Sequence, residues 1–317
     1  MSTARFVPET WHLDDDGPWP AARQLGRRHL AAQAFVRLRA ADGTSHARSM
    51  AFFVVLIAIQ GLVALVGVIS TVSDAGIAGA ARSIVEAVAP GPVGGALNTA
   101  IDQARAAGES ERYAAISLGL LGSLVTGTSA MGQFQRSLNR LYGVEHDRPT
   151  LAKYRRAFGL ALTAGSVMAL AFGAVAFGNI VGGSLEQGPL VTLWNVVRLP
   201  LGLVLLAAAM AILMSWCPQR RRPGWSWLAV GAGVAVTLWA AVTAALNIAF
   251  GLTDSFGDVY GPLAGVVALV IWSYVSSLGL LYGAAVAAEL ESFRSDRRSA
   301  QWTAAGDAAA EARLSRS

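Results

Sequence analysis

The sequence predicts an all-α membrane protein with six transmembrane helices and both termini in the cytoplasm. Hydrophobic residues make up 54% of the 317-residue chain and charged residues only 14%, whereas about a quarter of the residues in a soluble domain are charged. Six uncharged runs are long enough to cross a hydrocarbon layer of about 30 Å, which takes about 20 apolar residues. Lys and Arg residues gather in alternate loops, as the positive-inside rule requires.

The uncharged runs divide the chain into a basic N-terminal segment (residues 1–48), a membrane domain (49–291) and a polar C-terminal tail (292–317). The spans expected within the membrane domain are residues 50–73, 113–135, 157–182, 199–217, 227–250 and 262–288. The first loop, residues 74–112, is long enough to hold two short amphipathic helices. The single cysteine, Cys217, cannot form a disulfide within the chain.

The distribution of basic residues sets the expected orientation. Of the 25 Lys and Arg residues, 21 lie in the N-terminal segment, the second and fourth loops and the tail, and four lie in the odd-numbered loops. This bias places both termini in the cytoplasm. Because topology accounts for the net charge of +5, we expect contacts with anionic membrane lipids and no nucleic acid partner. No apolar run precedes residue 50, so we expect no secretory signal peptide.

The N-terminal segment contains one helical pattern, in which apolar side chains share an arc that leaves Arg28, Arg37 and Arg39 outside it. The members of the arc are Leu30, Ala31, Ala34, Phe35 and Leu38. Such a pattern is typical of a helix that lies on a membrane surface. Arg23 and Arg27 interrupt the arc, so a solvated basic tail is an equally supported alternative.

Residues 131–156, between the second and third spans, carry six of the basic residues and form what we call the basic hairpin tip. A helix is expected to continue from the second span as far as Gly143, a natural stop, and Pro149 and Thr150 are expected to separate it from the next helix. This segment holds the candidate binding residues, which are Gln133, Arg136, Asn139, Arg140 and Tyr142.

Arg136 and Arg140 lie one helical turn apart and therefore share a face. A guanidinium group offers a bidentate fork to phosphate oxygens, so the pair suits a phosphorylated lipid headgroup, with Gln133, Asn139 and Tyr142 nearby. The alternative is that these arginines only fix the topology and touch anionic lipid non-specifically.

Motifs for enzymatic chemistry are not found in the sequence. The four histidines are scattered without HExxH or CxxC spacing, and no Walker or GxSxG motif occurs. We therefore expect no enzyme activity, no metal and no cofactor. The polar residues inside the spans are neutral, and Gln60 and Asn247 are expected to make hydrogen bonds between helices.

Small and aromatic residues predict contacts at the helix surfaces. Glycine pairs at Gly119 and Gly122, Gly261 and Gly265, and Gly279 and Gly283 favour close helix packing, which could also support oligomers. Trp225 and Trp227 are expected to anchor the fifth span at the membrane interface.

Two stretches resemble the YihY/BrkB family of bacterial inner-membrane proteins. One is residues 135–145, QRSLNRLYGVE, and the other extends from Tyr260 through Trp272 and Gly283 to Glu289, Leu290 and Glu291. The resemblance covers about residues 45–291. It departs from the family pattern in the last helix, where Ala285 and Ala287 replace an acidic residue and an asparagine.

The resemblance implies a protein of the bacterial inner membrane that supports envelope integrity. It also implies that the chain transports or flips an anionic lipid or a lipid-linked precursor. One alternative is a scaffolding membrane protein that transports nothing. A remote alternative is a membrane-tethered ribonuclease, a label that some family members carry and that draws no support from these residues.

Overall fold

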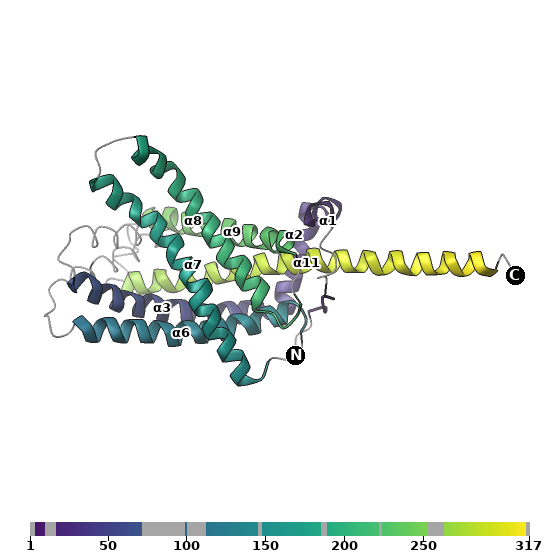
Figure 1. Ribbon diagram of the computed structural model, residues 1–317, viewed down its shortest axis with the longest axis horizontal. Helices are drawn as coiled ribbons and strands as arrows, with labels where there is room; N and C mark the ends of the chain where they lie inside the picture. Colours follow the sequence, from purple (N-terminus) through teal and green to yellow (C-terminus); the bar gives the residue numbers. More distant parts are fainter. Residues whose placement is uncertain are drawn as a thin grey trace.

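The computed structural model describes residues 4–9, 17–71, 99, 112–144, 148–184, 189–221, 224–252 and 263–314. Every regular element in this part of the chain is an α-helix, which confirms the predicted all-α class (Figure 1). The helices are α1 (Pro18–Leu25), α2 (Arg27–Ala40), α3 (Gly43–Thr71), α6 (Arg112–Leu141), α7 (Thr150–Ser184), α8 (Pro189–Trp216), α9 (Trp225–Gly251) and α11 (Ala264–Leu314).

The six long helices α3, α6, α7, α8, α9 and α11 each contain most of one predicted span. Three of them carry stretches that are long and apolar enough, within the described residues, to cross a membrane: Thr192–Trp216, Trp225–Phe250 and Ala264–Asp296. The full number of six spans and the side on which the termini lie stay predictions. The two short helices expected in the first loop fall mostly outside the described residues.

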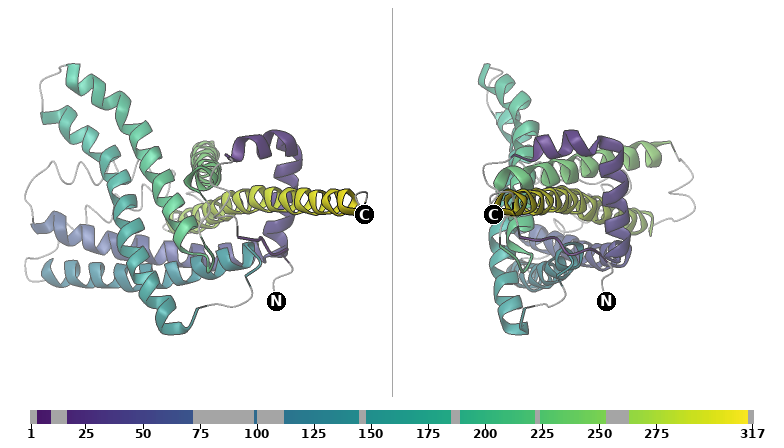
Figure 2. Two further views of the ribbon diagram at one scale, coloured as in Figure 1. Left: turned by 45° about the vertical axis from the view of Figure 1, so that its right-hand side comes forward. Right: turned by 90° about the vertical axis from the view of Figure 1, so that its right-hand side faces the viewer.

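The six long helices contact one another in chain order, and α11 closes the ring against α3. Figure 1 shows α3, α6, α9 and α11 running along the long axis of the molecule, whereas the α7–α8 hairpin is inclined across them. The helix α2 runs crosswise at the end of the bundle where α3 begins, and both views of Figure 2 agree on this. The C-terminal part of α11 extends beyond that end.

One helix begins earlier than the sequence predicts. The fourth span was expected to start at residue 199, but α8 begins at Pro189 and passes through Pro200. A proline inside a helix removes one backbone hydrogen bond, and helices in membranes accept this because neighbouring groups satisfy the freed carbonyl. Arg198, which we expected in a loop, therefore lies within the helix.

Small residues bring two pairs of helices close together, as the glycine pattern predicts. On α9 and α11, a Cβ atom at Gly283 would lie 2.6 Å from the Cβ atom of Ala235 and 2.6 Å from the carbonyl oxygen of Gly231. On α3 and α6, Gly119 lies against the backbone of Ala64 in the same manner. Gly261 lies outside the described residues.

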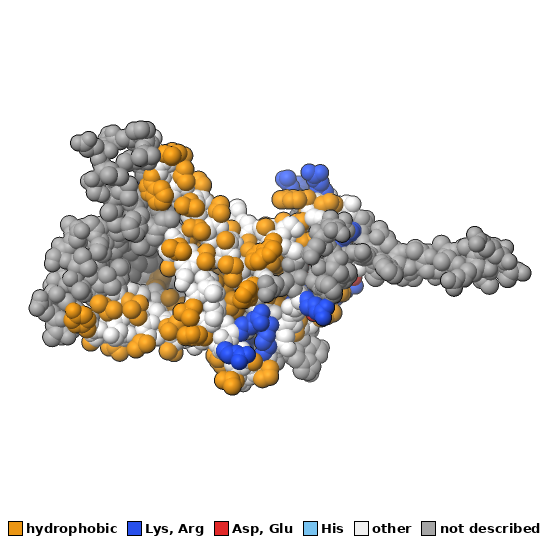
Figure 3. All heavy atoms as spheres, in the orientation of Figure 1, with side chains coloured by type: hydrophobic (Ala, Val, Ile, Leu, Met, Phe, Trp, Pro, Cys, Tyr) orange, Lys and Arg blue, Asp and Glu red, His pale blue; other side chains and the backbone are white. Residues whose placement is uncertain are grey.

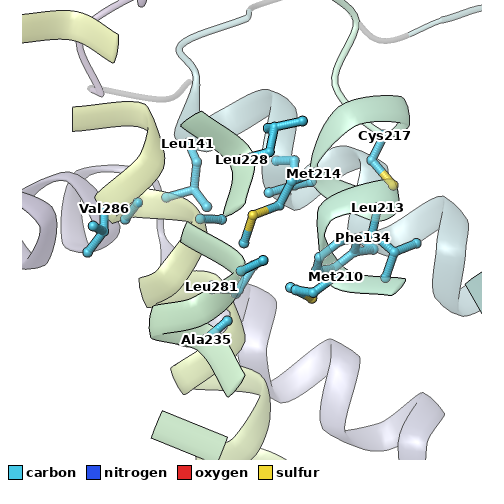
Figure 4. Close-up of a cluster of buried hydrophobic side chains, with 14 of the residues drawn as sticks. Phe134, Leu141, Met210, Leu213, Met214, Cys217, Leu228, Ala235, Leu281 and Val286 are labelled. Atoms are coloured by element: carbon cyan, nitrogen blue, oxygen red, sulfur yellow. The ribbon is translucent and has the colours of Figure 1, made fainter. Parts of the chain in front are cut away.

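The core is best filled near one end of the bundle, where α6, α8, α9 and α11 meet. Figure 4 shows Phe134, Met210, Met214 and Leu281 pointing toward one another there. The tryptophan prediction is half wrong, because Trp227 belongs to this core and is 3% exposed, whereas Trp225 is 60% exposed. Two residues that are two positions apart on a helix point in nearly opposite directions, so both could not face the interface.

Replacing Gly283 by alanine should destabilise the contact between α9 and α11. The added methyl group would overlap backbone and Ala235, and overpacking of this kind costs about 1–3 kcal/mol. Gly233→Ala on α9 is the matched control, because nothing lies within 4 Å of its added Cβ atom. Unfolding of the purified protein in mixed micelles should show a lower free energy of unfolding for Gly283→Ala and an unchanged one for Gly233→Ala. Equal stability of the two variants would contradict the described packing.

Candidate functional site

Two acidic residues in the middle of α11 hold together the end of the bundle where α2 crosses. Arg37 of α2 donates from Nε to Glu289 Oε2 at 2.7 Å, and Arg220, after α8, donates from Nη2 to Glu291 Oε2 at 2.6 Å. The Glu291 side chain is fully buried and each arginine side chain is only 5% exposed. Buried charges persist only when they are paired, so these two ion pairs fix the positions of three separate segments. We call this region the junction.

Tyr142 completes the junction from the end of α6. Its hydroxyl donates to Glu291 Oε1 at 3.1 Å, and the guanidinium of Arg220 lies 4.4 Å above the centre of its ring. Burial raises the pKa of Tyr142 well above its ordinary value of 10, and Glu291 raises it further, while Arg220 opposes the shift. The hydroxyl therefore stays protonated and remains a donor at physiological pH.

Residues 4–9, which we call the N-terminal strap, lie across the junction. The Val7 amide donates to the Tyr142 carbonyl at 3.1 Å. Arg37 Nη1 donates to the carbonyl of Arg5 at 2.9 Å, and Arg220 Nη2 donates to the carbonyl of Pro8 at 3.2 Å. Val7 is 1% exposed. The same two arginines that neutralise the acidic residues thus also hold the strap.

A glycine makes room for the strap. Helix α6 ends at Leu141, and Gly143 follows with φ +70°, a left-handed conformation that glycine adopts without strain. A Cβ atom at Gly143 would lie only 2.6 Å from the Cα atom of Phe6. The prediction that Gly143 stops the helix is confirmed, and its second role is to let another segment approach.

The loop after α8 is held by two more polar side chains, Asn139 of α6 and Arg148, which precedes α7. Arg148 donates from Nη1 to the carbonyl of Cys217 at 2.9 Å and from Nη2 to that of Pro218 at 2.8 Å. Asn139 Oδ1 accepts from the amide of Gln219 at 2.8 Å. Both carbonyls follow the end of α8 at Trp216, so Arg148 satisfies backbone acceptors that the helix itself does not pair.

The five predicted binding residues fall into two groups. Gln133 pairs with His46 at 3.1 Å, and Asn139 and Tyr142 have the internal partners described above, so these three side chains are engaged within the protein. Arg136 is exposed and Arg140 is half-buried. Contact of any of the five with a lipid headgroup stays a prediction.

Arg136 and Arg140 share a surface with the beginning of α7, because Tyr154 packs against Gly132 of α6. Leu151 is 84% exposed there, Tyr154 is 47% exposed and Arg155 is exposed as well. Figure 3 shows Lys and Arg side chains gathered beside exposed apolar ones at this corner. The tip surface, as we call it, consists of Arg136, Arg140, Leu151, Tyr154 and Arg155.

The sequence did not reveal the residues that build the junction. Arg37 was expected on the polar side of α2, but it is 6% exposed, whereas Phe35 from the predicted apolar arc is 58% exposed. The partner of Arg37 lies 252 residues away in the chain. The sequence does show Arg37 close to an apolar helical face. Such a pattern does not identify a partner that lies 252 residues away in the chain.

The family of the chain follows from sequence comparison. The sequence model of the virulence factor BrkB family matches residues 34–308. The chain belongs to this family. The match includes α11 as far as residue 308, with Glu289 and Glu291, the second half of α2, with Arg37, and the whole basic hairpin tip.

Three curated relatives are similar over part of their lengths. A UPF0761 membrane protein of Halorhodospira halophila is 27% identical over 61% of this chain and 41% of its own length. A UPF0761 membrane protein of Rhodospirillum rubrum is 32% identical over 57% of this chain and 41% of its own. A Bacillus subtilis protein, YfkH, whose name calls it ribonuclease-like, is 21% identical over 55% of this chain and 65% of its own. The chain thus spans about two fifths of the length of the first two relatives.

No solved structure matches the chain. Among the described residues, no three His, Cys, Asp or Glu side chains gather as they would around a metal ion.

Replacing Glu291 by glutamine should destabilise the protein strongly. The substitution leaves Arg220 buried without its counter-charge, and breaking a buried pair costs about 3–5 kcal/mol. Glu9→Gln is the control, because Glu9 and Arg221 form an exposed pair at 3.9 Å and such pairs contribute less than about 1 kcal/mol. Titration with a denaturing detergent measures the free energy of unfolding of both variants. Two equally stable variants would show that the junction does not depend on this charge.

Proposed function

We propose that this BrkB-family protein crosses the bacterial inner membrane six times, with both termini in the cytoplasm, and supports envelope integrity. In this proposal it transports or flips an anionic lipid or a lipid-linked precursor. The tip surface is where the headgroup of that lipid first binds.

The observation that supports this proposal is how the structure distributes its arginines. Arg37 and Arg220 donate hydrogen bonds to carboxylates inside the protein, and Arg148 donates to a backbone carbonyl. Arg136 and Arg155 are exposed on one corner. An anion can reach these exposed guanidinium groups from outside the protein.

The apolar members of the tip surface favour a membrane lipid over a soluble anion. Leu151, at 84% exposure, lies next to arginine side chains at the start of α7. An exposed leucine gains free energy by entering the interface of a bilayer, and arginine side chains nearby can then reach the phosphate layer. A soluble phosphate would leave Leu151 in water.

The junction supports a second candidate, a scaffolding protein that transports nothing. Its buried ion pairs and the strap tie α2, α6, α8 and α11 into one rigid end, which suits a platform for other envelope proteins. Reconstituted vesicles separate the two candidates. Transport predicts movement of a labelled anionic lipid between leaflets, and scaffolding predicts none together with a stable complex of a second envelope protein.

Lipid retention tests the tip surface directly. Native mass spectrometry should detect an anionic lipid bound to the purified protein, and the double variant Arg136→Ala, Arg140→Ala should retain it about 30-fold more weakly. This figure follows from about 1 kcal/mol for each arginine near a membrane surface and a factor of ten for each 1.4 kcal/mol.

The matched control removes the same charge elsewhere. Arg23→Ala, Arg27→Ala alters two exposed arginines of α1 and α2, and it should retain the lipid like the unchanged protein. Equally weakened lipid retention in both double variants would mean that retention depends only on the net charge of the protein. Undiminished retention in the first variant would remove the tip surface as the headgroup site.

A further inference from the structure

Five polar side chains inside the predicted spans carry buried atoms without a hydrogen-bond partner, and one of them, Ser215, lies near the end of α8. The other four lie near the centres of their spans. They are Gln60 Oε1 on α3, Ser123 Oγ on α6, and Ser273 Oγ and Ser276 Oγ on α11. Ser273 is fully buried and Ser276 is 6% exposed. The hydrogen bond between helices that we expected from Gln60 is therefore not made by its carbonyl oxygen.

Other hydroxyl groups of the same bundle behave differently. Thr128 Oγ1 donates to the carbonyl of Leu124 at 2.7 Å, and Ser129 Oγ donates to that of Val125 at 3.0 Å. This bond to the carbonyl four residues earlier is the usual way in which a helix satisfies serine and threonine. Ser123, Ser273 and Ser276 do not use it, so their hydroxyl groups remain available for another partner.

Gln60, Ser123 and Ser273 lie at one depth in the bundle, and Ser276 lies one turn of α11 nearer the junction. Ser123 precedes Tyr142 by 19 residues on α6, and Ser273 precedes Glu291 by 18 residues on α11. Tyr142 and Glu291 are hydrogen-bonded at the junction, and both helices run toward it, so a rise of 1.5 Å per residue places both serines about 27–29 Å away. Gln60 is at the same level, because its Cδ atom would lie 3.1 Å from a Cβ atom at Gly122.

The serines of α11 also face the interior of the bundle. Eighteen residues make five turns of a helix, so Ser273 lies on the same face as Glu291. That face contacts α6, because Glu291 accepts the hydrogen bond of Tyr142. Helix α11 contacts α3 as well. Gln60, Ser123 and Ser273 therefore come from three helices, α3, α6 and α11, each of which contacts the other two.

The shared depth is the middle of the membrane. The predicted spans 50–73, 113–135 and 262–288 have their centres near residues 61, 124 and 275. Unsatisfied polar groups at that depth cost several kcal/mol each, since hydrocarbon offers no hydrogen bonds. Four such groups within one helical turn of this level therefore indicate a partner that enters the bundle. All four are uncharged, so they suit a neutral group with several hydrogen-bonding atoms.

We propose that Gln60, Ser123, Ser273 and Ser276 form a binding site at the bilayer midplane for the hydroxyl groups of a polyol headgroup, hydrated when empty. The site binds the neutral part of the lipid of the proposed function. It rests on the six-span arrangement of that proposal, because this arrangement places the four side chains in the membrane. It does not depend on Arg136 or Arg140.

Thiol labelling tests whether the site is hydrated. In a Cys217→Ser background, reconstituted Ser273→Cys and Ser276→Cys should react with a small hydrophilic methanethiosulfonate at least tenfold faster than Ala268→Cys. Ala268 is the matched control, because it is fully buried on the same helix and lies closer to the predicted outer surface. Equal, slow labelling of all three would overturn the site and show that these serines are packed dry.

Lipid composition tests the class of ligand. Phosphatidylglycerol and phosphatidylserine carry the same net charge, but only the first ends in a diol. In phosphatidylethanolamine vesicles, added phosphatidylglycerol should slow the labelling of Ser273→Cys at least threefold more than added phosphatidylserine does. Equal protection by both lipids, or protection by neither, would overturn the polyol assignment.

A third variant separates failure of the site from failure of the topology. Ser45 is exposed in the first turn of α3, on the predicted cytoplasmic side. Ser45→Cys should resist a membrane-impermeant thiol reagent applied to intact cells and react after the cells are broken. Labelling in intact cells would refute the six-span orientation, whereas protected Ser45→Cys with unreactive Ser273→Cys would refute only the midplane site.

Discussion

The junction depends on two buried ion pairs, Arg37 with Glu289 and Arg220 with Glu291. A charge inside a protein is tolerated only beside its partner, so each acidic residue of α11 fixes the segment that carries its arginine. Arg37 and Arg220 also donate to backbone carbonyls of the N-terminal strap. The position of α2, the loop after α8 and the strap therefore all follow from the burial of two carboxylates on one helix.

The arginines at the junction end of the bundle fall into two groups with different roles. Those that face inward close the end of the bundle, and those of the tip surface remain at the boundary with solvent or lipid. The positive-inside rule alone does not distinguish the buried arginines of the junction from the exposed arginines of the tip surface. Toward the middle of the bundle the side chains change in kind, because the polar groups there are neutral. The charged junction and the neutral middle of the bundle offer two different chemistries along the same helices.

The sequence was sufficient for the features that depend on local pattern. The all-α class, the six long helices, the stop at Gly143 and the break before α7 at Pro149 follow from hydrophobic length and from glycine and proline chemistry. The early start of α8 was missed because the predicted span was an uncharged run bounded by Arg198, whereas the helix continues past that charge. For the candidate site, Tyr142 and Asn139 were predicted to contact a headgroup, and the structure shows both hydrogen-bonded within the protein. Arg37 and Arg220 meet partners 252 and 71 residues away, and no spacing rule reports such contacts.

Hydrogen exchange of the N-terminal strap tests the central claim that the buried pairs hold it across the junction. In the unchanged protein, the amide of Val7 donates to the Tyr142 carbonyl, and it should exchange at least about a hundredfold more slowly than the same amide in an unstructured peptide. Mass spectrometry of a peptide that includes residues 4–9 would measure this. Exchange at the unprotected rate would contradict the account, because a strap held by Arg37 and Arg220 cannot leave its amide open to solvent.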